Sequence, residues 1–172
     1  QLRLNNLDLK CIKPARHIPD PAPVEPPFFV DHAMDNKRGK GLSFAKRIYV
    51  PRIIGLGIGC FSVMATLYPL DPPAWLWGLL LFNGFIWPHL ALRLSTRSAY
   101  PFQAERRNML IDSLWGGFWA ASMQFNPLPT VTILSMMIMN NVAAGGQKML
   151  LRGAVAQLAG VLISWGLLGV AF

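Results

Sequence analysis

The chain has 172 residues, which is the length of one domain or of one small membrane bundle. Only 14% of its residues are charged and 53% are hydrophobic, with a mean hydropathy of +0.36. Soluble domains are about 25% charged, so this composition excludes an ordinary soluble globule. The formal net charge is +8, but the basic residues are sparse and lie between long apolar runs, which argues against a nucleic-acid partner. The two cysteines, Cys11 and Cys60, form neither a disulfide framework nor a metal-ligand spacing.

The first 36 residues differ in composition from the rest. Six prolines fall within residues 1–35, and proline lacks the backbone N–H that helices and sheets need. We predict that residues 1–36 are a disordered cytoplasmic tail. The segment has no basic start, apolar core and cleavage site, so it is not a secretory signal. Residues 37–172 form the second predicted unit, a transmembrane domain.

Five apolar runs follow, each long enough or nearly long enough to cross a bilayer as a helix. We therefore expect an all-α polytopic transmembrane bundle, with spans at about residues 48–70, 75–92, 109–125, 128–144 and 149–172. Only the stretch 126–129, Asn-Pro-Leu-Pro, separates the third run from the fourth. That spacing favours a tight turn between two antiparallel spans, and a re-entrant hairpin is the alternative.

Basic residues lie on one side of these spans. Twelve Lys and Arg residues flank the cytoplasmic ends, and the opposite loops contain none. This asymmetry predicts a cytoplasmic N-terminus. Five spans that start in the cytoplasm leave residue 172 on the outer side. We therefore expect a sixth span beyond it. Six of the basic residues are also candidates for contact with anionic lipid head groups, at about 1 kcal/mol each: Lys37, Arg38, Lys40, Lys46, Arg47 and Arg52.

Polar residues inside the spans are candidates for a functional site, because ionisable groups are costly in a membrane. Three spans carry imidazole, carboxylate and amide groups at a similar depth in the cytoplasmic leaflet. We predict a buried polar cluster of His89, Asp112, Asn140, Asn141 and Asn108. Such a cluster either binds a ligand or ion, or holds two arrangements of the bundle. The alternative is a purely structural network in which Asp112 bonds Asn108 one turn earlier.

Other motifs favour packing. Gly55, Gly57 and Gly59 lie within a span rather than after a strand, so they predict a small-residue face for close helix contact and not a phosphate loop. Pro88, in the sequence Trp-Pro-His, is expected to kink or end the second span. We find no catalytic motif and no metal-binding pattern, so no catalytic residue is predicted in this chain.

These segments, in this order and spacing, resemble the second type of membrane-associated sensor (MASE) domain. The resemblance covers residues 38–172 and rests on GLSFAKR at residues 41–47, PRIIGL at 51–56, WPHLA at 87–91, Asn108 with Asp112, and NNVAAGG at 140–146. The residues that carry the family motif are Pro51, Gly55, Trp87, Pro88, Gly145 and Gly146.

The resemblance implies an N-terminal bundle, usually of six spans, in the bacterial inner membrane. In that family a cytoplasmic output domain follows, most often a GGDEF diguanylate cyclase and sometimes an adenylate cyclase. It therefore implies a signal-input and anchoring domain of a cyclic-di-GMP synthase that forms a homodimer in the bilayer. GTP and Mg²⁺ are expected only for the output domain, and no cofactor for this chain. The alternatives are the input domain of an adenylate cyclase, or a small transporter or channel subunit with His89, Asp112 and Asn140 along its pathway.

Overall fold

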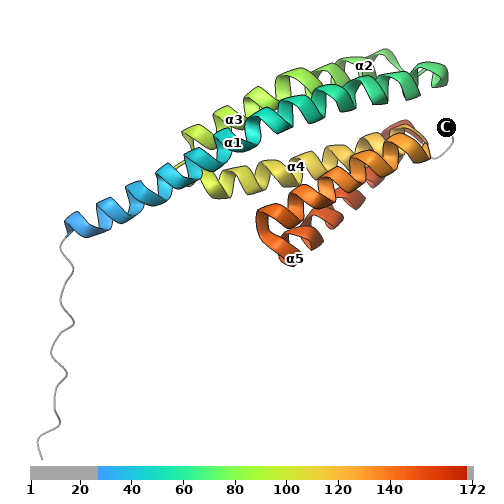
Figure 1. The fold of residues 1–172 in the computed structure, drawn as a ribbon. Coiled ribbons are helices and arrows are strands. Elements are labelled where there is room, and N and C mark those ends of the chain that lie inside the picture. Colours follow the sequence, from blue (N-terminus) through green and yellow to red (C-terminus); the bar gives the residue numbers. More distant parts are fainter. Residues whose placement is uncertain (1–26, 170–172) are drawn as a thin grey trace, which may run out of the picture.

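The computed structural model describes residues 27–169, with side chains from residue 35 onward, and this part of the chain contains helices and no strand. The all-α prediction is therefore confirmed for the described residues. Figure 1 shows long helices packed side by side. In chain order they are α1 (Pro27–Leu67), the short 3₁₀ helix η1 (Tyr68–Leu70), α2 (Ala74–Leu81), the π-helical turn η2 (Phe82–Ile86), α3 (Trp87–Arg97), α4 (Pro101–Ser122) and α5 (Pro127–Leu168).

Three helical segments are long and apolar enough to cross a membrane by length and composition: Asp35–Leu70, Ala74–Arg97 and Pro127–Leu168. The second of these is the continuous run of α2, η2 and α3. Helix α4 does not qualify, although it has 22 residues. It contains Glu105, Arg106, Arg107 and Asp112, and these charges lower its hydropathy.

Helix α5 folds back on itself at Gly145 and Gly146. Gly146 has φ 61° and ψ −151°, a left-handed backbone that glycine adopts most readily. The amide of Asn141 lies directly against the backbone of Gly153, yet in a straight helix two residues twelve positions apart would be about 18 Å apart. We call residues 127–144 the first arm and residues 147–168 the second arm. The arms run antiparallel (Figure 1), and the bend lies between the predicted fourth and fifth spans.

Glycines on α4 and on the second arm let their backbones touch. A Cβ atom at Gly117 would overlap the carbonyl oxygen of Gln157, and one at Gly160 would overlap that of Leu114. The Gly116–Gly117 pair is thus a packing notch. On α1, Gly55 seats the side chain of Met136, whereas a Cβ at Gly59 would meet no atom within 4 Å. The predicted small-residue face of α1 therefore makes close contact at Gly55 and not at Gly59.

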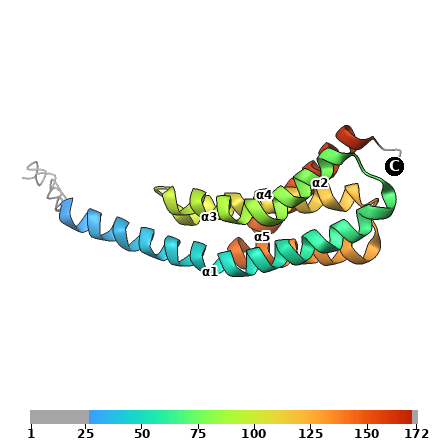
Figure 2. The ribbon, with the colours of Figure 1, turned by 90° about the horizontal axis from the view of Figure 1, so that it is seen from above.

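A hydrophobic core fills the end of the bundle near the α1–α2 connection. Its buried members come from α1, α2 and α4: Cys60, Val63, Leu67, Leu76, Leu80, Phe118, Trp119 and Met123. In Figure 2, seen from above, α1 runs along one side of the bundle and its N-terminal part extends beyond the other helices. The opposite half of the bundle contains polar contacts between α1, α3 and α4 and a smaller apolar cluster of Met109, Ala144 and Met149.

The helix around Pro88 does not end where the sequence suggested. Instead, α3 continues to Arg97, and the π-helical turn η2 comes immediately before Trp87. Pro88 is the second residue of α3, where its missing N–H falls next to the wider π turn and the helix can continue. Of the two alternatives expected at Pro88, a kink or an end of the helix, the end is wrong, and the regular helix is interrupted by η2 directly before Trp87.

The ends of the described helices also differ from the expected boundaries. Helix α1 begins at Pro27, ten residues before the predicted start of the membrane domain at residue 37. The rest of the predicted tail, residues 1–26, and the last three residues of the predicted fifth span lie outside the described residues. Each of the other predicted spans falls within, or overlaps, a described helix.

Replacing Gly117 by alanine should lower the stability of the bundle, because the new methyl group would push α4 away from the second arm. We expect a loss of about 1–3 kcal/mol, measured as a lower unfolding temperature of the detergent-solubilised protein by circular dichroism. Gly57→Ala is the matched control, since a Cβ atom there meets nothing within 4 Å. Equal effects of the two substitutions would contradict the close α4–α5 contact.

Candidate functional site: a buried ion-pair cluster

Arg52 on α1 forms ion pairs with two carboxylates of α4. Its Nη2 atom is 2.6 Å from Oε1 of Glu105, and its Nε atom donates to Oδ2 of Asp112 at 3.0 Å. All three residues are buried, with exposed fractions of 7% for Arg52, 0% for Glu105 and 8% for Asp112. We call these residues, with the three polar partners described next, the ion-pair cluster.

Helix geometry explains why two acids meet one arginine. Glu105 and Asp112 are seven residues apart, which is about two turns, so both side chains lie on the face of α4 turned toward α1. The planar guanidinium carries several donors and can therefore engage both carboxylates at once. The contact to Glu105 is close but poorly aligned, since neither Nη2 nor Oε1 completes a hydrogen bond with a described residue.

Helix α3 supplies the remaining partners. The indole Nε1 of Trp87 donates to Oδ1 of Asp112 at 2.6 Å, and the hydroxyl of Ser95 donates to Oε2 of Glu105 at 2.6 Å. Asn108, between the two acids on α4, donates from Nδ2 to the Ser95 hydroxyl and to the backbone carbonyl of Ala91, both at 2.9 Å. The cluster thus connects α1, α3 and α4.

Each of the four carboxylate oxygens faces a donor or a positive group. Both acids therefore depend on partners from α1 and α3. Charges buried away from water are stabilised only by well-placed partners, and the removal of one partner leaves the others unpaired.

The structure brings some of the predicted site residues together and leaves others apart. Asp112 and Asn108 belong to the ion-pair cluster, and Asp112 bonds Arg52 and Trp87 rather than Asn108. Asn141 is buried nearby and donates to the hydroxyl of Ser113 at 2.7 Å. Asn140 is exposed, so it is not part of the cluster.

His89 also lies outside the cluster. Its side chain is exposed, and its Nδ1 atom is 2.7 Å from the hydroxyl of Tyr49 on α1. The two rings meet edge to face with their centroids 5.8 Å apart. His89 therefore helps to join α3 to α1 on the surface of the bundle, next to the buried contact between Trp87 and Asp112.

Arg52 requires a correction. The sequence placed it with the cytoplasmic, lipid-facing basic residues, but its guanidinium is buried against Glu105 and Asp112. Arg52 is buried because the two acids on α4 pair with its guanidinium, which would otherwise need water or lipid head groups as partners. The other five residues of that group, Lys37, Arg38, Lys40, Lys46 and Arg47, are exposed as expected.

Glu105 and the donor role of Trp87 were missed by sequence reasoning. Within residues 36–172 the only acids are Asp71, Glu105 and Asp112. Two signals could have identified the ion pairs: the seven-residue spacing of Glu105 and Asp112, and the single basic residue, Arg52, just inside the first span.

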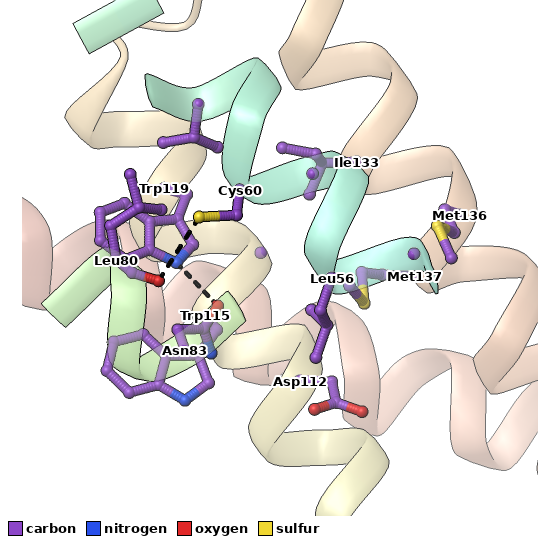
Figure 3. A pocket seen from close by; sticks show the side chains of 14 residues that line it. Leu56, Cys60, Leu80, Asn83, Asp112, Trp115, Trp119, Ile133, Met136 and Met137 are labelled. Carbon is purple, nitrogen blue, oxygen red and sulfur yellow. Dashed lines mark hydrogen bonds between the residues drawn. The ribbon is translucent and has the colours of Figure 1, made fainter. Parts of the chain in front are cut away.

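A second polar contact crosses the bundle near a small cavity (Figure 3). Nε1 of Trp119 on α4 donates to Oδ1 of Asn83 in η2 at 3.1 Å. Beside it, a cavity of about 40 Å³ is enclosed by α1, α2, η2, α4 and the first arm of α5. In the described part of the chain, no group of three or more His, Cys, Asp or Glu side chains is placed to hold a metal ion.

Comparison with known proteins identifies the chain's relatives. Residues 47–135 match the model of the MASE2 domain. The chain is 33% identical over 130 residues to the probable diguanylate cyclase DgcC of Escherichia coli strain K12, and equally to that of strain O6:H1 CFT073. These matches cover 76% of the chain but 35% of each relative, so the chain spans about a third of their length. No solved structure is significantly similar.

The match confirms the resemblance inferred from the sequence motifs. The matched residues 47–135 contain every member of the ion-pair cluster, and also Pro51, Gly55 and Pro88. Gly145 and Gly146, at the bend of α5, lie beyond them.

Replacing Arg52 by leucine should destabilise the bundle strongly, because two carboxylates would remain buried without their cation. The expected cost is about 3–5 kcal/mol, measured as loss of thermal stability in detergent. Arg47→Leu, on the exposed part of the same helix, should change stability by less than about 0.5 kcal/mol.

A charge-free version of the cluster provides the second comparison. Adding Glu105→Gln and Asp112→Asn to Arg52→Leu should restore part of the lost stability, since the unpaired charges are then gone. If the triple variant were as unstable as Arg52→Leu alone, the ion pairs would not be the cause.

Proposed function

The chain belongs to the MASE2 domain family, and we propose that it is the membrane-embedded signal-input and anchoring domain of a bacterial diguanylate cyclase. In this role it passes a membrane signal to a cytoplasmic GGDEF output domain that makes cyclic-di-GMP from GTP. The observation that carries the proposal is the family match over residues 47–135, together with a similarity to a probable diguanylate cyclase that extends over 76% of the chain.

The ion-pair cluster supplies a mechanism for signal transfer. It joins α1, α3 and α4 through buried charges, and such contacts break or form as a unit because a half-paired charge is costly. A signal that binds one packing of these helices better than another shifts the population toward it. The second arm of α5 packs backbone to backbone on α4, so a displacement of α4 reaches the C-terminal end of the described chain.

The proposed topology has five passes in the inner membrane with the N-terminus in the cytoplasm. The passes are α1 with η1, the run from α2 to α3, α4, and the two arms of α5. The distribution of the basic residues supports this orientation, and the backbone at Gly145 and Gly146 supports the division of α5 into two passes. Helix α4 can cross because its two acids are paired inside the bundle.

The proposed partners are the lipid bilayer and a second copy of the protein. Helix α1 carries an exposed apolar stripe of Val50, Ile54, Ile58 and Phe61. This spacing places the stripe along one side of the helix, where it faces either lipid tails or the same helix of a second copy. GTP and Mg²⁺ would bind to the output domain.

Two alternatives differ in what the membrane part does. An adenylate cyclase in place of the GGDEF domain would keep the same input role and change the messenger. A small transporter needs polar groups across the whole membrane, but beyond Asn83 the bundle is filled by the apolar core around Phe118 and Met123. The charged groups of the ion-pair cluster also face one another instead of an open path, which favours the input role.

Reporter fusions test the five-pass topology. Fusions after residues 98 and 146 should report the cytoplasm, and fusions after residues 72 and 126 the outer side. The expected alternation follows from five antiparallel passes, measured with paired alkaline phosphatase and green fluorescent protein reporters. If residues 126 and 146 report the same side, α5 does not divide into two passes.

A chimera tests the input role. Replacing the matching segment of the Escherichia coli K12 relative by this chain should retain membrane localisation and cyclic-di-GMP production, measured by mass spectrometry of cell extracts. The chimera with Asp112→Asn should reach the membrane but change its output at least about threefold, whereas Arg47→Leu should not. Unchanged cyclic-di-GMP production in the Asp112→Asn chimera would mean that the domain only anchors the enzyme and does not pass on a signal.

A further inference from the structure

A groove lies beside the N-terminal part of α1, at the end of the bundle where α3 connects to α4. Helix α1 forms one wall, and the α3–α4 connection with the start of α4 forms the other. The groove has a volume of about 780 Å³, which is within the range of about 300–1,000 Å³ for small-molecule sites. Its described lining residues include three cations and three aromatic side chains: Lys37, Arg38, Lys40, Phe44, Tyr100 and Phe102.

Helices α1 and α4 touch at the base of this groove. A Cβ atom at Gly41 would lie 2.9 Å from the backbone nitrogen of Phe102 and 3.2 Å from Cβ of Pro101. The rings of Phe44 and Phe102 pack beside this contact, with their centroids 5.0 Å apart. Phe102 is nevertheless 43% exposed and Tyr100 is 64% exposed. The groove therefore has an aromatic floor that the described residues leave uncovered.

Positive charge surrounds this floor. Lys37, Arg38 and Lys40 are exposed, and Asp35 is the only acid among the described lining residues, so three cations and one acid sum to +2. Within the described part of the chain the ion pairs are those of Arg52, and none of them engages the cations of the groove. An anionic ligand therefore fits the groove, and a cation would be repelled.

The basic side of α1 leads from the groove to the membrane surface. Lys37, Lys40, Phe44 and Arg47 are three, four and three positions apart, which places them on one face of the helix. A second hollow of about 480 Å³ adjoins the groove, and it is lined by Lys40, Phe44 and Arg47 among others. Arg47 directly precedes the apolar run that begins at Ile48. This face therefore connects the groove to the start of the first pass.

The floor of the groove lies at the level of lipid head groups. Phe44 precedes residue 48 by four positions, which is about 6 Å along a helix. The head-group layer is about 5–8 Å thick on each side of the hydrocarbon core. Lys40 lies one turn further out, and a long lysine side chain can bend back toward that layer. The anion nearest to the groove is thus the phosphate of a membrane lipid.

We propose that this groove is a binding site for one anionic phospholipid of the cytoplasmic leaflet. The basic residues of its rim engage the lipid phosphate, and Phe44 and Phe102 contact the glycerol and the first acyl carbons. Basic pockets between helices on the cytoplasmic side of a membrane bind such head groups in other proteins. The lipid would bridge α1 and α4, the same two helices that Arg52 joins. The choice of leaflet rests on the proposed topology, whereas binding itself does not.

Native mass spectrometry of the full chain in detergent tests the site, because it counts bound lipids one at a time. The probe is dioleoyl phosphatidylglycerol. Its matched control is dioleoyl phosphatidylcholine, which has the same acyl chains and phosphate but a cationic group that cancels the charge. The test variant is Lys40→Gln, at a residue that lines both hollows. The control variant is Lys46→Gln, which removes an exposed lysine of α1 that lines neither hollow.

The wild type should bind its first phosphatidylglycerol at least about fivefold more tightly than phosphatidylcholine. Lys40→Gln should weaken that binding about fivefold, the ratio expected for one basic residue near a lipid surface, and Lys46→Gln less than about twofold. Equal losses in the two variants would mean attraction by the net charge of the whole chain. Equal binding of the two lipids would mean association through the acyl chains alone. Either result overturns the site.

A soluble phosphate distinguishes a lipid site from a general anion site. Glycerol 3-phosphate, which is the head group without acyl chains, should not displace phosphatidylglycerol at a tenfold molar excess, because it lacks the contacts with the aromatic floor. Displacement under that condition would show that the groove takes its anion from solution, and the lipid assignment would be wrong.

The lipid site and the proposed topology fail separately. If a reporter after residue 98 indicates the outer side while Lys40→Gln still weakens phosphatidylglycerol binding, the site stands and its leaflet is wrong. If that reporter indicates the cytoplasm and phosphatidylglycerol binds no better than phosphatidylcholine, the topology stands and the lipid site is wrong.

Discussion

The buried guanidinium of Arg52 is the constraint on which the polar half of the bundle depends. An arginine in the membrane interior is tolerated only with nearby partners, and here the partners are two acids on α4. Those acids in turn need Trp87 and Ser95, which fixes α3 against α4. One charged side chain thereby links three helices, beside a smaller apolar cluster around Met109 and Met149 that also packs against α1.

The opposite half of the bundle is stabilised by close packing of apolar side chains and glycines. There α1, α2 and α4 share an apolar core around Leu80 and Phe118, and α4 meets the second arm of α5 through glycine notches at Gly117 and Gly160. In lipid, apolar side chains gain little by associating with one another, so close backbone approach provides much of the stability. The two halves differ in kind: one is held by close backbone contact at glycines and an apolar core, the other by buried ion pairs.

The sequence predicted the helical class and a break between residues 144 and 149, where α5 bends, because hydropathy and glycine content act locally. It predicted five spans, whereas three helical segments are long and apolar enough to cross a membrane by length and composition. It did not predict the partner of Arg52, since that contact joins residues 60 positions apart and depends on the rotation of α1 relative to α4. His89 and Asp112 have similar depths in the sequence, yet one is exposed and the other buried. The depth of a residue follows from its position in a span. Whether its side chain points into the bundle or outward depends on how the helices pack, and a single sequence does not reveal that packing.

A helix end at Pro88, one of the two expected alternatives, did not form for a related reason. Proline usually ends a helix because it removes one hydrogen bond of the regular ladder, but the π turn at Phe82–Ile86 changes that ladder just before the proline. The same turn places Asn83 toward Trp119 and Gly84 close to Cys60 of α1. π turns inside helices often occur at functional positions.

Asp112 links the two polar features of the bundle. Its oxygens bond Arg52 and Trp87 in the ion-pair cluster, and its side chain also lines the cavity beside Asn83. Because Asp112 joins α4 to Arg52 on α1 and to Trp87 on α3, a change in the surroundings of this one side chain acts on the packing of three helices.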